Sequence, residues 1–128
     1  MGKPTCLIVT ETPSHWIFHK EMLEDFKGVI VDICRTIGEV DKYLNEKKYT
    51  FGIISNTMLQ GAQDSFNAGV IEVAPLFETR NIPYVLLSTA MKLPDIEDKN
   101  LNNCIFNGLA VNQSPLELVD TLKSHKLL

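Results

Sequence analysis

The unit from which the fold is built appears first in the stretch Cys6-Leu7-Ile8-Val9-Thr10-Glu11-Thr12-Pro13. Its first four residues form a short apolar run that predicts a buried strand. Thr12 is a helix-capping residue, and Pro13 suits the first helical position. Gly28 predicts the end of that helix. Between them, the apolar residues at helical spacing are Phe18, Met22, Leu23 and Phe26. The stretch therefore predicts a strand that leads directly into an amphipathic helix.

The same alternation of a short apolar run and a helical pattern continues along the chain. Capping-box sequences at 36–39 and 114–117 predict two further helix starts. A third helical pattern around 70–77 contains Pro75, which we expect near a helix start because proline disrupts an interior turn. Residues 91–102 contain few apolar side chains, so we expect one or two helical turns there at most. The remaining strands are predicted at 29–33, 51–54, 82–87 and 103–106.

This order of elements predicts the α/β class. Strands that alternate with helices pair in parallel, and strands without inward and outward alternation are covered on both faces. We therefore expect a doubly wound three-layer (βα)5 sandwich. Its five-stranded parallel sheet would have the order 2-1-3-4-5, as in flavodoxin-like folds, and its fourth helix would be short or degenerate. A length of 128 residues fits a single domain over 1–128.

Composition narrows the classes of function. A net charge of −4 argues against a nucleic-acid-binding surface, which normally carries a basic stripe. The three cysteines lie in apolar runs, which fits a reducing compartment and predicts a cytoplasmic protein. The N-terminus lacks the pattern of a signal peptide, and we expect no membrane-spanning segment.

The residues predicted at the carboxyl ends of the strands are the candidate site. In a doubly wound sheet the functional edge lies there, near the switch point between the first and third strands. The side chains expected at this edge are Thr10, Glu11, Ser55, Asn56, Ser88 and Asn107.

In order and length these strands resemble the receiver domains of response regulators, the CheY-like family. Residues 7–11 stand where receivers have an apolar strand that ends in two acidic residues. The segment YTFGIISNTM at 49–58 resembles the strand that bears the phospho-accepting aspartate, with Ser55 at that position. Residues 82–90 resemble the strand that ends in the receiver serine or threonine, here Ser88, and Asn107 falls where receivers have a lysine.

The differences from the family pattern imply that the phosphorylation chemistry is lost. A receiver needs a carboxylate nucleophile, acidic groups that hold Mg²⁺, and a lysine for the phosphoryl oxygens. Here Thr10, Ser55 and Asn107 replace an acid, the nucleophile and the lysine. Glu11 and Ser88 keep the pattern, and a shift of one residue would bring Asn56 to the acceptor position without restoring a carboxylate. We therefore expect a degenerate phosphoacceptor pocket with no catalytic residue, metal or cofactor, in a pseudo-receiver that is not an enzyme.

The resemblance also implies a partner surface. In the family this surface involves the fourth helix, the fifth strand and the fifth helix, which here predicts Phe106, Leu109 and Val111. The expected partner is a protein of a signalling pathway, such as a histidine kinase or an output domain of the same parent chain, or a second copy in a homodimer; neither nucleic acid nor membrane is expected. Phosphorylation in receivers moves an aromatic residue on the fifth strand. That position is Cys104 here, and Phe106 should point the same way.

Several alternatives remain open at this stage. The main one is a small-ligand sensing domain of flavodoxin-like fold, which would take a nucleotide, a metabolite or a flavin. His15 and His19 could share a metal ion but are better explained as surface residues. Trp16 is either an exposed anchor for a partner or a residue that covers the edge of the sheet. Cys34 is either a reactive thiol or, as we favour, a buried structural one. The acidic residues Asp95, Glu97 and Asp98 are interpreted as a solvated loop.

Overall fold

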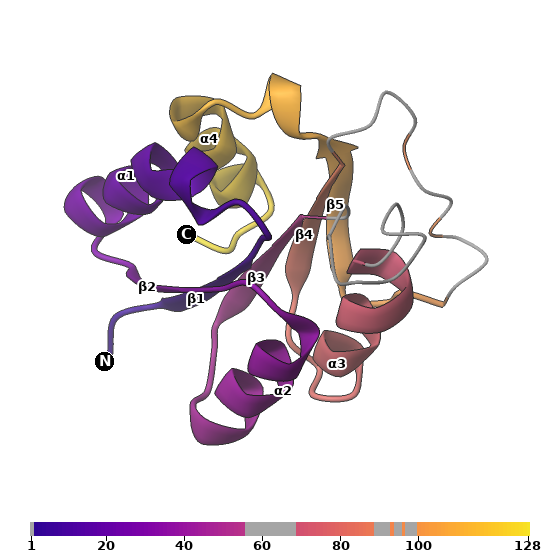
Figure 1. The fold of residues 1–128 in the computed structure, drawn as a ribbon. Helices are drawn as coiled ribbons and strands as arrows, with labels where there is room; N and C mark the ends of the chain where they lie inside the picture. Colours follow the sequence, from indigo (N-terminus) through magenta and orange to yellow (C-terminus); the bar gives the residue numbers. More distant parts are fainter. Residues whose placement is uncertain (1, 56–68, 89–92, 94–95, 97–99) are drawn as a thin grey trace.

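The computed structural model describes residues 2–55, 69–88, 93, 96 and 100–128. Its centre is a parallel sheet with the strand order β2-β1-β3-β4-β5 (Figure 1). The strands are β1 (Thr5–Val9), β2 (Ile30–Cys34), β3 (Phe51–Ser55), β4 (Tyr84–Ser88) and β5 (Cys104–Leu109). The predicted order 2-1-3-4-5 is confirmed, and β5 runs on to Leu109, beyond its predicted end at Phe106.

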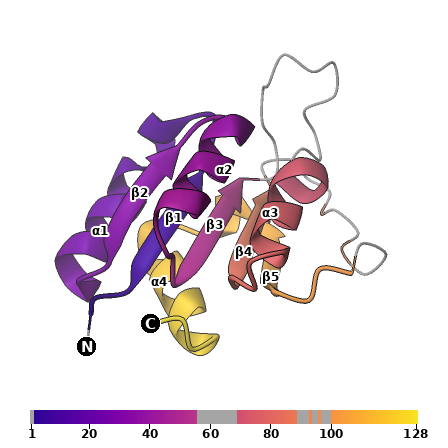
Figure 2. The ribbon, with the colours of Figure 1, turned by 90° about the horizontal axis from the view of Figure 1, so that it is seen from below.

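Helices cover both faces of the sheet, which gives the predicted three layers (Figures 1 and 2). On one face lie α1 (Ile17–Lys27), which follows the 3₁₀ turn η1 (Pro13–Trp16), and α4 (Pro115–Ser124), which follows η4 (Ala110–Asn112). On the other face lie α2 (Ile37–Glu46) and α3 (Ala74–Glu78), which is entered through the π-helical turn η2 (Gly69–Val73). Most of the crossover between β4 and β5, including the acidic residues Asp95, Glu97 and Asp98, lies outside the described residues. The expectation of a short fourth helix therefore stays a prediction.

The helix termini follow the sequence signals closely. Thr36 Oγ1 accepts from the Glu39 N–H (3.2 Å), and the Glu39 carboxylate accepts from the Thr36 N–H (3.1 Å), which is the predicted capping box of α2. Gly28 ends α1 in the left-handed region at φ 65°, where glycine carries no side-chain penalty. Pro75 lies in the first turn of α3, as predicted.

The box predicted at the start of α4 is only half formed. Ser114 Oγ accepts from the Glu117 N–H (3.4 Å), as an N-cap should. The Glu117 carboxylate, however, accepts from the Ser114 hydroxyl (2.8 Å), whereas in a capping box it would accept from the Ser114 backbone N–H.

Two apolar clusters, one on each face of the sheet, form the core. The cluster under α2 and α3 is centred on Phe77 and Tyr84, and the cluster under α1 and α4 includes Leu23 and Leu118. The ring of Phe77 lies directly on the backbone of Gly52, where an added Cβ would come within 2.3 Å of the ring. Gly52 therefore allows α3 to approach the middle of the sheet closely.

Only part of the apolar pattern of α1 faces the core. Leu23 is buried and Met22 is half-buried, but Phe18 and Phe26 are 72% and 73% exposed. The chain enters α1 through the 3₁₀ turn η1. Trp16 (6% exposed) lies seven residues before Leu23 and shares the inner face with it. The amphipathic helix is therefore formed as predicted, but two of the four apolar residues in its pattern, the phenylalanines, face solvent.

The prediction that Cys104 and Phe106 point the same way was also wrong. Along β4 and β5 the register passes from Tyr84 beside Cys104 to Val85 beside Phe106, which leaves one extra residue on β5. Such a β-bulge reverses the alternation of the strand. Cys104 packs against the cluster under α2 and α3, and Phe106 packs against the cluster under α1 and α4.

Candidate functional site

The carboxyl ends of three neighbouring strands bring buried hydroxyl groups to one edge of the sheet. Thr10 follows β1, Ser55 ends β3 and Ser88 ends β4. Their exposed fractions are 0%, 4% and 1%. Because parallel strands finish at the same edge, these residues occupy the end at which doubly wound sheets carry their functional sites.

Thr10 shapes the loop that leaves β1. Its N–H donates to the Cys34 carbonyl oxygen (3.0 Å), which extends the pairing of β1 with β2. Its Oγ1 accepts from the Thr12 N–H (3.1 Å) and lies 3.3 Å from Thr12 Oγ1. A threonine hydroxyl that binds the backbone two residues ahead stabilises a turn. The Thr10 hydroxyl therefore has a structural partner in its own loop.

Ser88 and Asn107 lie on the same face of the sheet. The register places Ser88 beside Leu109 and Asn107 beside Leu86, and alternate residues of a strand share a face. Asn107 is half-buried and Ser88 is buried. Among the residues that the structure describes, Ser88 Oγ has no hydrogen-bond partner. The next residues, 89–92, are not among them.

Glu11 is the one carboxylate among the described positions of the predicted pocket. It is half-exposed at the start of the loop after Thr10. In the part of the chain that the structure describes, no group of three His, Cys, Asp or Glu side chains could hold a metal ion. Asn56, the alternative acceptor position, lies outside the described residues.

The three residues of the predicted partner surface do not form one exposed face. Phe106 is half-buried, its ring centroid lies 5.8 Å from that of His125, and the ring covers Gly108, where an added Cβ would come within 2.5 Å. Leu109 is half-buried on the opposite face. Val111, in η4, is 81% exposed. Of the three residues, Val111 is the most available to a partner.

Burial raises the pKa of all three cysteine thiols. Cys34 is 1% exposed, and its pKa is raised to about 12, first by burial and then by the charges of Glu39 and Asp32. Burial likewise raises the pKa of Cys6 well above its usual value, and that of Cys104 to about 11. Because the thiolate is the reactive form, these pKa values favour the structural interpretation of Cys34.

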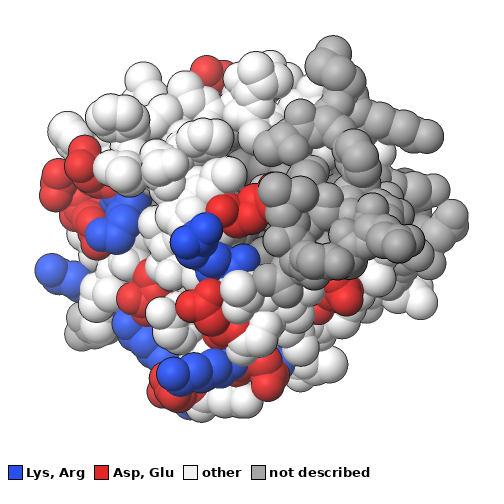
Figure 3. Space-filling model, viewed as in Figure 1, with Lys and Arg blue, Asp and Glu red and all other residues white. Residues whose placement is uncertain are grey.

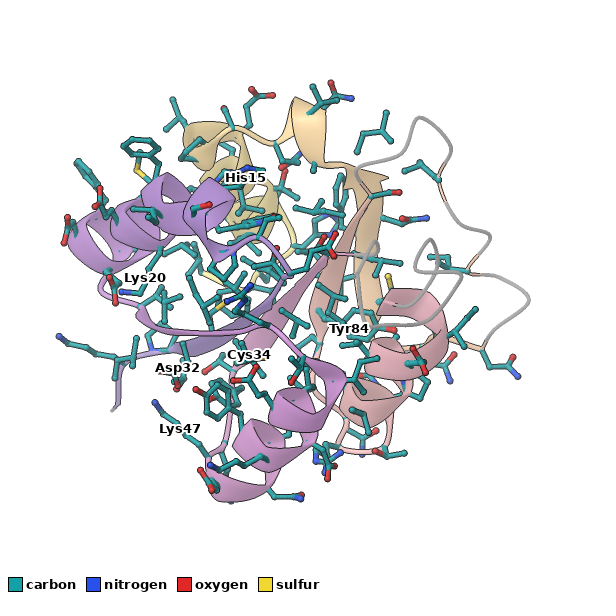
Figure 4. All side chains as sticks on the ribbon, viewed as in Figure 1. His15, Lys20, Asp32, Cys34, Lys47 and Tyr84 are labelled. Atoms are coloured by element: carbon teal, nitrogen blue, oxygen red, sulfur yellow. The ribbon has the colours of Figure 1, made fainter. Side chains whose placement is uncertain are left out.

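The side chains of η1 and the start of α1 line a cavity of about 250 Å³ beside η4. His19 Nε2 lies 2.8 Å from the Gln113 carbonyl oxygen, and its ring centroid is 4.8 Å from that of Trp16. His15 is exposed at the η1 end of the helix (Figure 4). Trp16 is buried in the cluster under α1 and α4, which excludes the exposed anchor and agrees with the other alternative, a residue that covers the sheet. Sequence reasoning missed this cavity because its walls lie about ninety residues apart in the chain.

The opposite end of the sheet carries ion pairs. Lys47 Nζ lies 2.8 Å from Asp32 Oδ2, and the Tyr49 hydroxyl donates to the same oxygen at 2.7 Å (Figure 4). Arg80 pairs with Asp41 at 3.1 Å. A cavity of about 430 Å³ lies between them, lined by Leu44, Lys47, Lys48, Tyr49, Arg80, Asn81 and Ile82.

Solved structures similar to this chain share its fold along nearly their whole length. A CheY-like response regulator receiver domain from Methanospirillum hungatei matches with a TM-score of 0.74 at 15% identity, over 98% of this chain and 94% of the other. The chemotaxis protein CheY4 of Vibrio cholerae matches with a TM-score of 0.73 at 17% identity, over 96% and 98%. The fold is that of a response-regulator receiver domain.

The response regulator TrrA of Thermotoga maritima, solved in complex with Mg²⁺ and BeF, has the same receiver fold, with a TM-score of 0.67 at 20% identity over 98% of this chain and 99% of the other. No protein-family model matches the sequence, and a search of curated proteins finds no match. At these identities the likeness to receiver domains establishes the fold. Among the described residues, no helix is both long and apolar enough to cross a membrane.

Proposed function

We propose that this chain is a pseudo-receiver: a receiver fold that is not phosphorylated and that acts as a protein-interaction module in cytoplasmic signal transduction. The observation that carries the proposal is the set of side chains at the functional edge. Buried Thr10, Ser55 and Ser88 stand at the ends of β1, β3 and β4. Among the described pocket positions, Glu11 alone is acidic.

The chemistry of these groups supports a silent site. A serine hydroxyl is a weak nucleophile without an adjacent general base, and the product of receiver phosphorylation is an acyl phosphate, which requires a carboxylate. Mg²⁺ is a hard cation that proteins usually bind through one or two carboxylates and the substrate's own oxygens. A single half-exposed glutamate, with neutral oxygens around it, provides a weak site for such an ion.

The partner is then recognised without a phosphorylation signal. A histidine kinase, an output domain of the same parent chain or a second copy would each fit the receiver fold. In all three cases the folded surface, and not a phosphoryl group, would determine binding.

The test compares the wild-type chain with a variant that restores the acidic chemistry. Melting temperature and intact mass are measured with and without Mg²⁺ and beryllofluoride, a phosphoryl mimic, and after exposure to acetyl phosphate. We expect no change in the wild type. The variant Thr10→Asp/Ser55→Asp/Asn107→Lys should gain a Mg²⁺-dependent stabilisation, because a ligand that binds only the folded state raises its stability.

Each outcome bears on a different part of the proposal. A Mg²⁺-dependent shift or a phosphorylated mass in the wild type would overturn the loss of phosphorylation. If the restored variant folds but remains silent, the assignment of Ser55 to the acceptor position is wrong.

A further inference from the structure

The cavity of about 430 Å³ lies at the amino ends of β3 and β4, at the other end of the sheet from the predicted pocket. Two short segments form most of its lining: one joins α2 to β3, and the other joins α3 to β4. The Gly52 N–H donates to the Pro83 carbonyl oxygen (2.9 Å), which holds the starts of the two strands together. Cavities of this size accept small molecules.

The lining of this cavity is cationic. Of the residues that the structure describes, three cations and no acid line it, although the whole chain has a net charge of −4. The three cations are Lys47, Lys48 and Arg80. In Figure 3 basic and acidic side chains lie side by side along the lower edge of the molecule, the end at which α2 finishes. Because a recess lined by charge of one sign attracts ligands of the opposite sign, the lining favours an anion.

Arg80 is held in position by the protein itself. Its Nη1 donates to the Leu76 carbonyl oxygen (2.8 Å). Its Nη2 donates to Asn45 Oδ1 (2.7 Å) and pairs with Asp41 (3.1 Å). These contacts engage most of the donors of the guanidinium, so Arg80 contributes a fixed charge to the cavity more than free hydrogen-bond donors. A charge that is already ordered loses little conformational entropy when a ligand binds.

The two lysines provide the donors. Lys47 Nζ pairs with Asp32 Oδ2 (2.8 Å), which leaves part of its three-donor ammonium group for a ligand. Among the described residues, the Lys48 side chain makes no hydrogen bond or ion pair. Asp32 and Asp41, the acids that pair with the other two cations, do not line the cavity. With both acids counted, the group keeps one net positive charge.

The remainder of the lining is mainly apolar. Leu44, Tyr49 and Ile82 are buried in the core cluster under α2 and α3 and reach the cavity from below the cations. The Tyr49 hydroxyl donates to Asp32 at 2.7 Å, so this residue offers its ring to a ligand. A ligand that fills the cavity would therefore have an apolar or aromatic body attached to its charged group.

The charge balance favours a dianion. Lys47 and Arg80 already have a carboxylate each, so a second carboxylate with a single charge would gain little by competing with Asp32 and Asp41. A phosphate monoester carries nearly two negative charges at neutral pH and has three strong acceptor oxygens. It can accept from two neighbouring ammonium groups at once, which a single carboxylate does less well.

We propose that this cavity binds a small phosphate monoester with an apolar or aromatic body. The phosphate would accept from Lys47 and Lys48 near the charge of Arg80, and the body would pack on Leu44 and Ile82. The site lies away from Thr10, Ser55 and Ser88, so it does not depend on the proposed loss of phosphorylation.

The test is a titration of the full 128-residue chain with phenyl phosphate, the simplest ligand of this class, followed by the backbone amide signals in NMR spectra. We expect saturable shifts at 47–49 and 80–82. Phenyl phosphate should bind more tightly than inorganic phosphate, which lacks the body, and than phenol, which lacks the charge. It should also bind more tightly than phthalate, a dicarboxylate on the same ring. Binding should weaken as salt is raised.

Two matched variants separate this cavity from a general effect of charge. Lys48→Glu should lower the affinity for phenyl phosphate by about tenfold or more, because it replaces a donor to the phosphate by a like charge. Lys123→Glu, which reverses an exposed lysine of α4 on the other face of the sheet, should change it by less than about twofold. Lys48→Gln removes the charge alone and should have an intermediate effect. Unchanged melting temperatures would show that the variants fold.

The site would be overturned if no saturation is seen by about 10 mM phenyl phosphate. It would also be overturned if Lys48→Glu and Lys123→Glu bind equally well, or if the shifts lie instead at the carboxyl ends of the strands, near Thr10 and Ser88. Binding of phthalate or phenol as tight as that of phenyl phosphate would overturn the assignment of a phosphate. None of these results bears on the pseudo-receiver proposal, which the Mg²⁺ and beryllofluoride measurements test separately.

Discussion

Helices α1 and α2 have similar amphipathic patterns in the sequence but expose very different surfaces. In α2 the apolar residues turn inward: Val40 and Leu44 are buried, and Ile37 packs against the core. In α1 the two phenylalanines at the ends of the apolar pattern turn outward. With the same kind of periodicity, α2 places its apolar residues against the core, whereas α1 also exposes apolar residues to solvent.

The two helices also start differently. A capping box fixes the first turn of α2, so its α-helical phase holds from Thr36 onward. The entry to α1 is a 3₁₀ turn without a side-chain cap hydrogen bond at Thr12 or Trp16. A helical pattern identifies an apolar side, but packing against neighbouring elements decides which part of that side meets the core.

The largest expected effect tests which residues of the two helices are in the core. Leu23→Ala in α1 and Leu44→Ala in α2 should each lower the free energy of unfolding by about 2–5 kcal/mol, because both side chains are buried. Phe18→Ala and Phe26→Ala should each change it by less than about 0.5 kcal/mol. Urea unfolding at neutral pH measures these values. A large decrease in the free energy of unfolding for either phenylalanine variant would show that this side chain also contributes to the core.

A smaller effect tests how the two helices start. Thr36→Ala removes the oxygen that caps α2 and should lower the free energy of unfolding by about 1 kcal/mol. Thr12→Ala, at the corresponding place before α1, should have a smaller effect because Thr12 makes no cap hydrogen bond there. Thermal unfolding of the two variants, followed by circular dichroism, provides the comparison. An equal loss would mean that a cap also fixes the entry to α1.

The smallest expected effect concerns the ion pair between Lys47, at the end of α2, and Asp32 in β2. Partial burial raises the pKa of Asp32, but hydrogen bonds from Lys47 and Tyr49 and the charge of Lys47 outweigh it, so the pKa is lowered overall. A carboxyl with a lowered folded-state pKa stabilises the protein above its unfolded pKa of about 4 and loses that contribution as the pH falls through the folded pKa.

Because the Lys47–Asp32 pair is partly exposed, Asp32→Asn should cost less than about 1 kcal/mol at pH 7. The wild type and the variant should converge in stability as the pH falls below about 4. Urea unfolding across this pH range measures the difference. Glu24→Gln, which breaks the pair within α1, should change stability by no more than about 0.5 kcal/mol. A difference between wild type and Asp32→Asn that persists at low pH would exclude the ion pair as its source.

The position of several candidate site residues in the fold could be predicted from the sequence because strand ends and residue types are local properties. The polar residues after each apolar run identified Thr10, Ser55 and Ser88, and the structure places all three, buried, at one edge of the sheet. The division of the predicted partner surface follows from the odd spacing of Phe106 and Leu109, which puts them on opposite faces of β5. What could not be foreseen is the β-bulge in β5, which turns Phe106 away from the face that it would otherwise share with Cys104.

The strand order was predicted from the known arrangement of doubly wound folds. The sequence by itself determined the parallel sheet, the cap of α2 and the scarcity of acidic groups at the predicted pocket. These follow from apolar periodicity, from side chains that bind their own backbone, and from the chemical identity of single residues. Only the tertiary structure decided that Trp16 is buried, that Phe18 and Phe26 are exposed, and that His19 meets Gln113. Such contacts join segments far apart in the chain, and their geometry depends on the helical phase and strand register that packing selects.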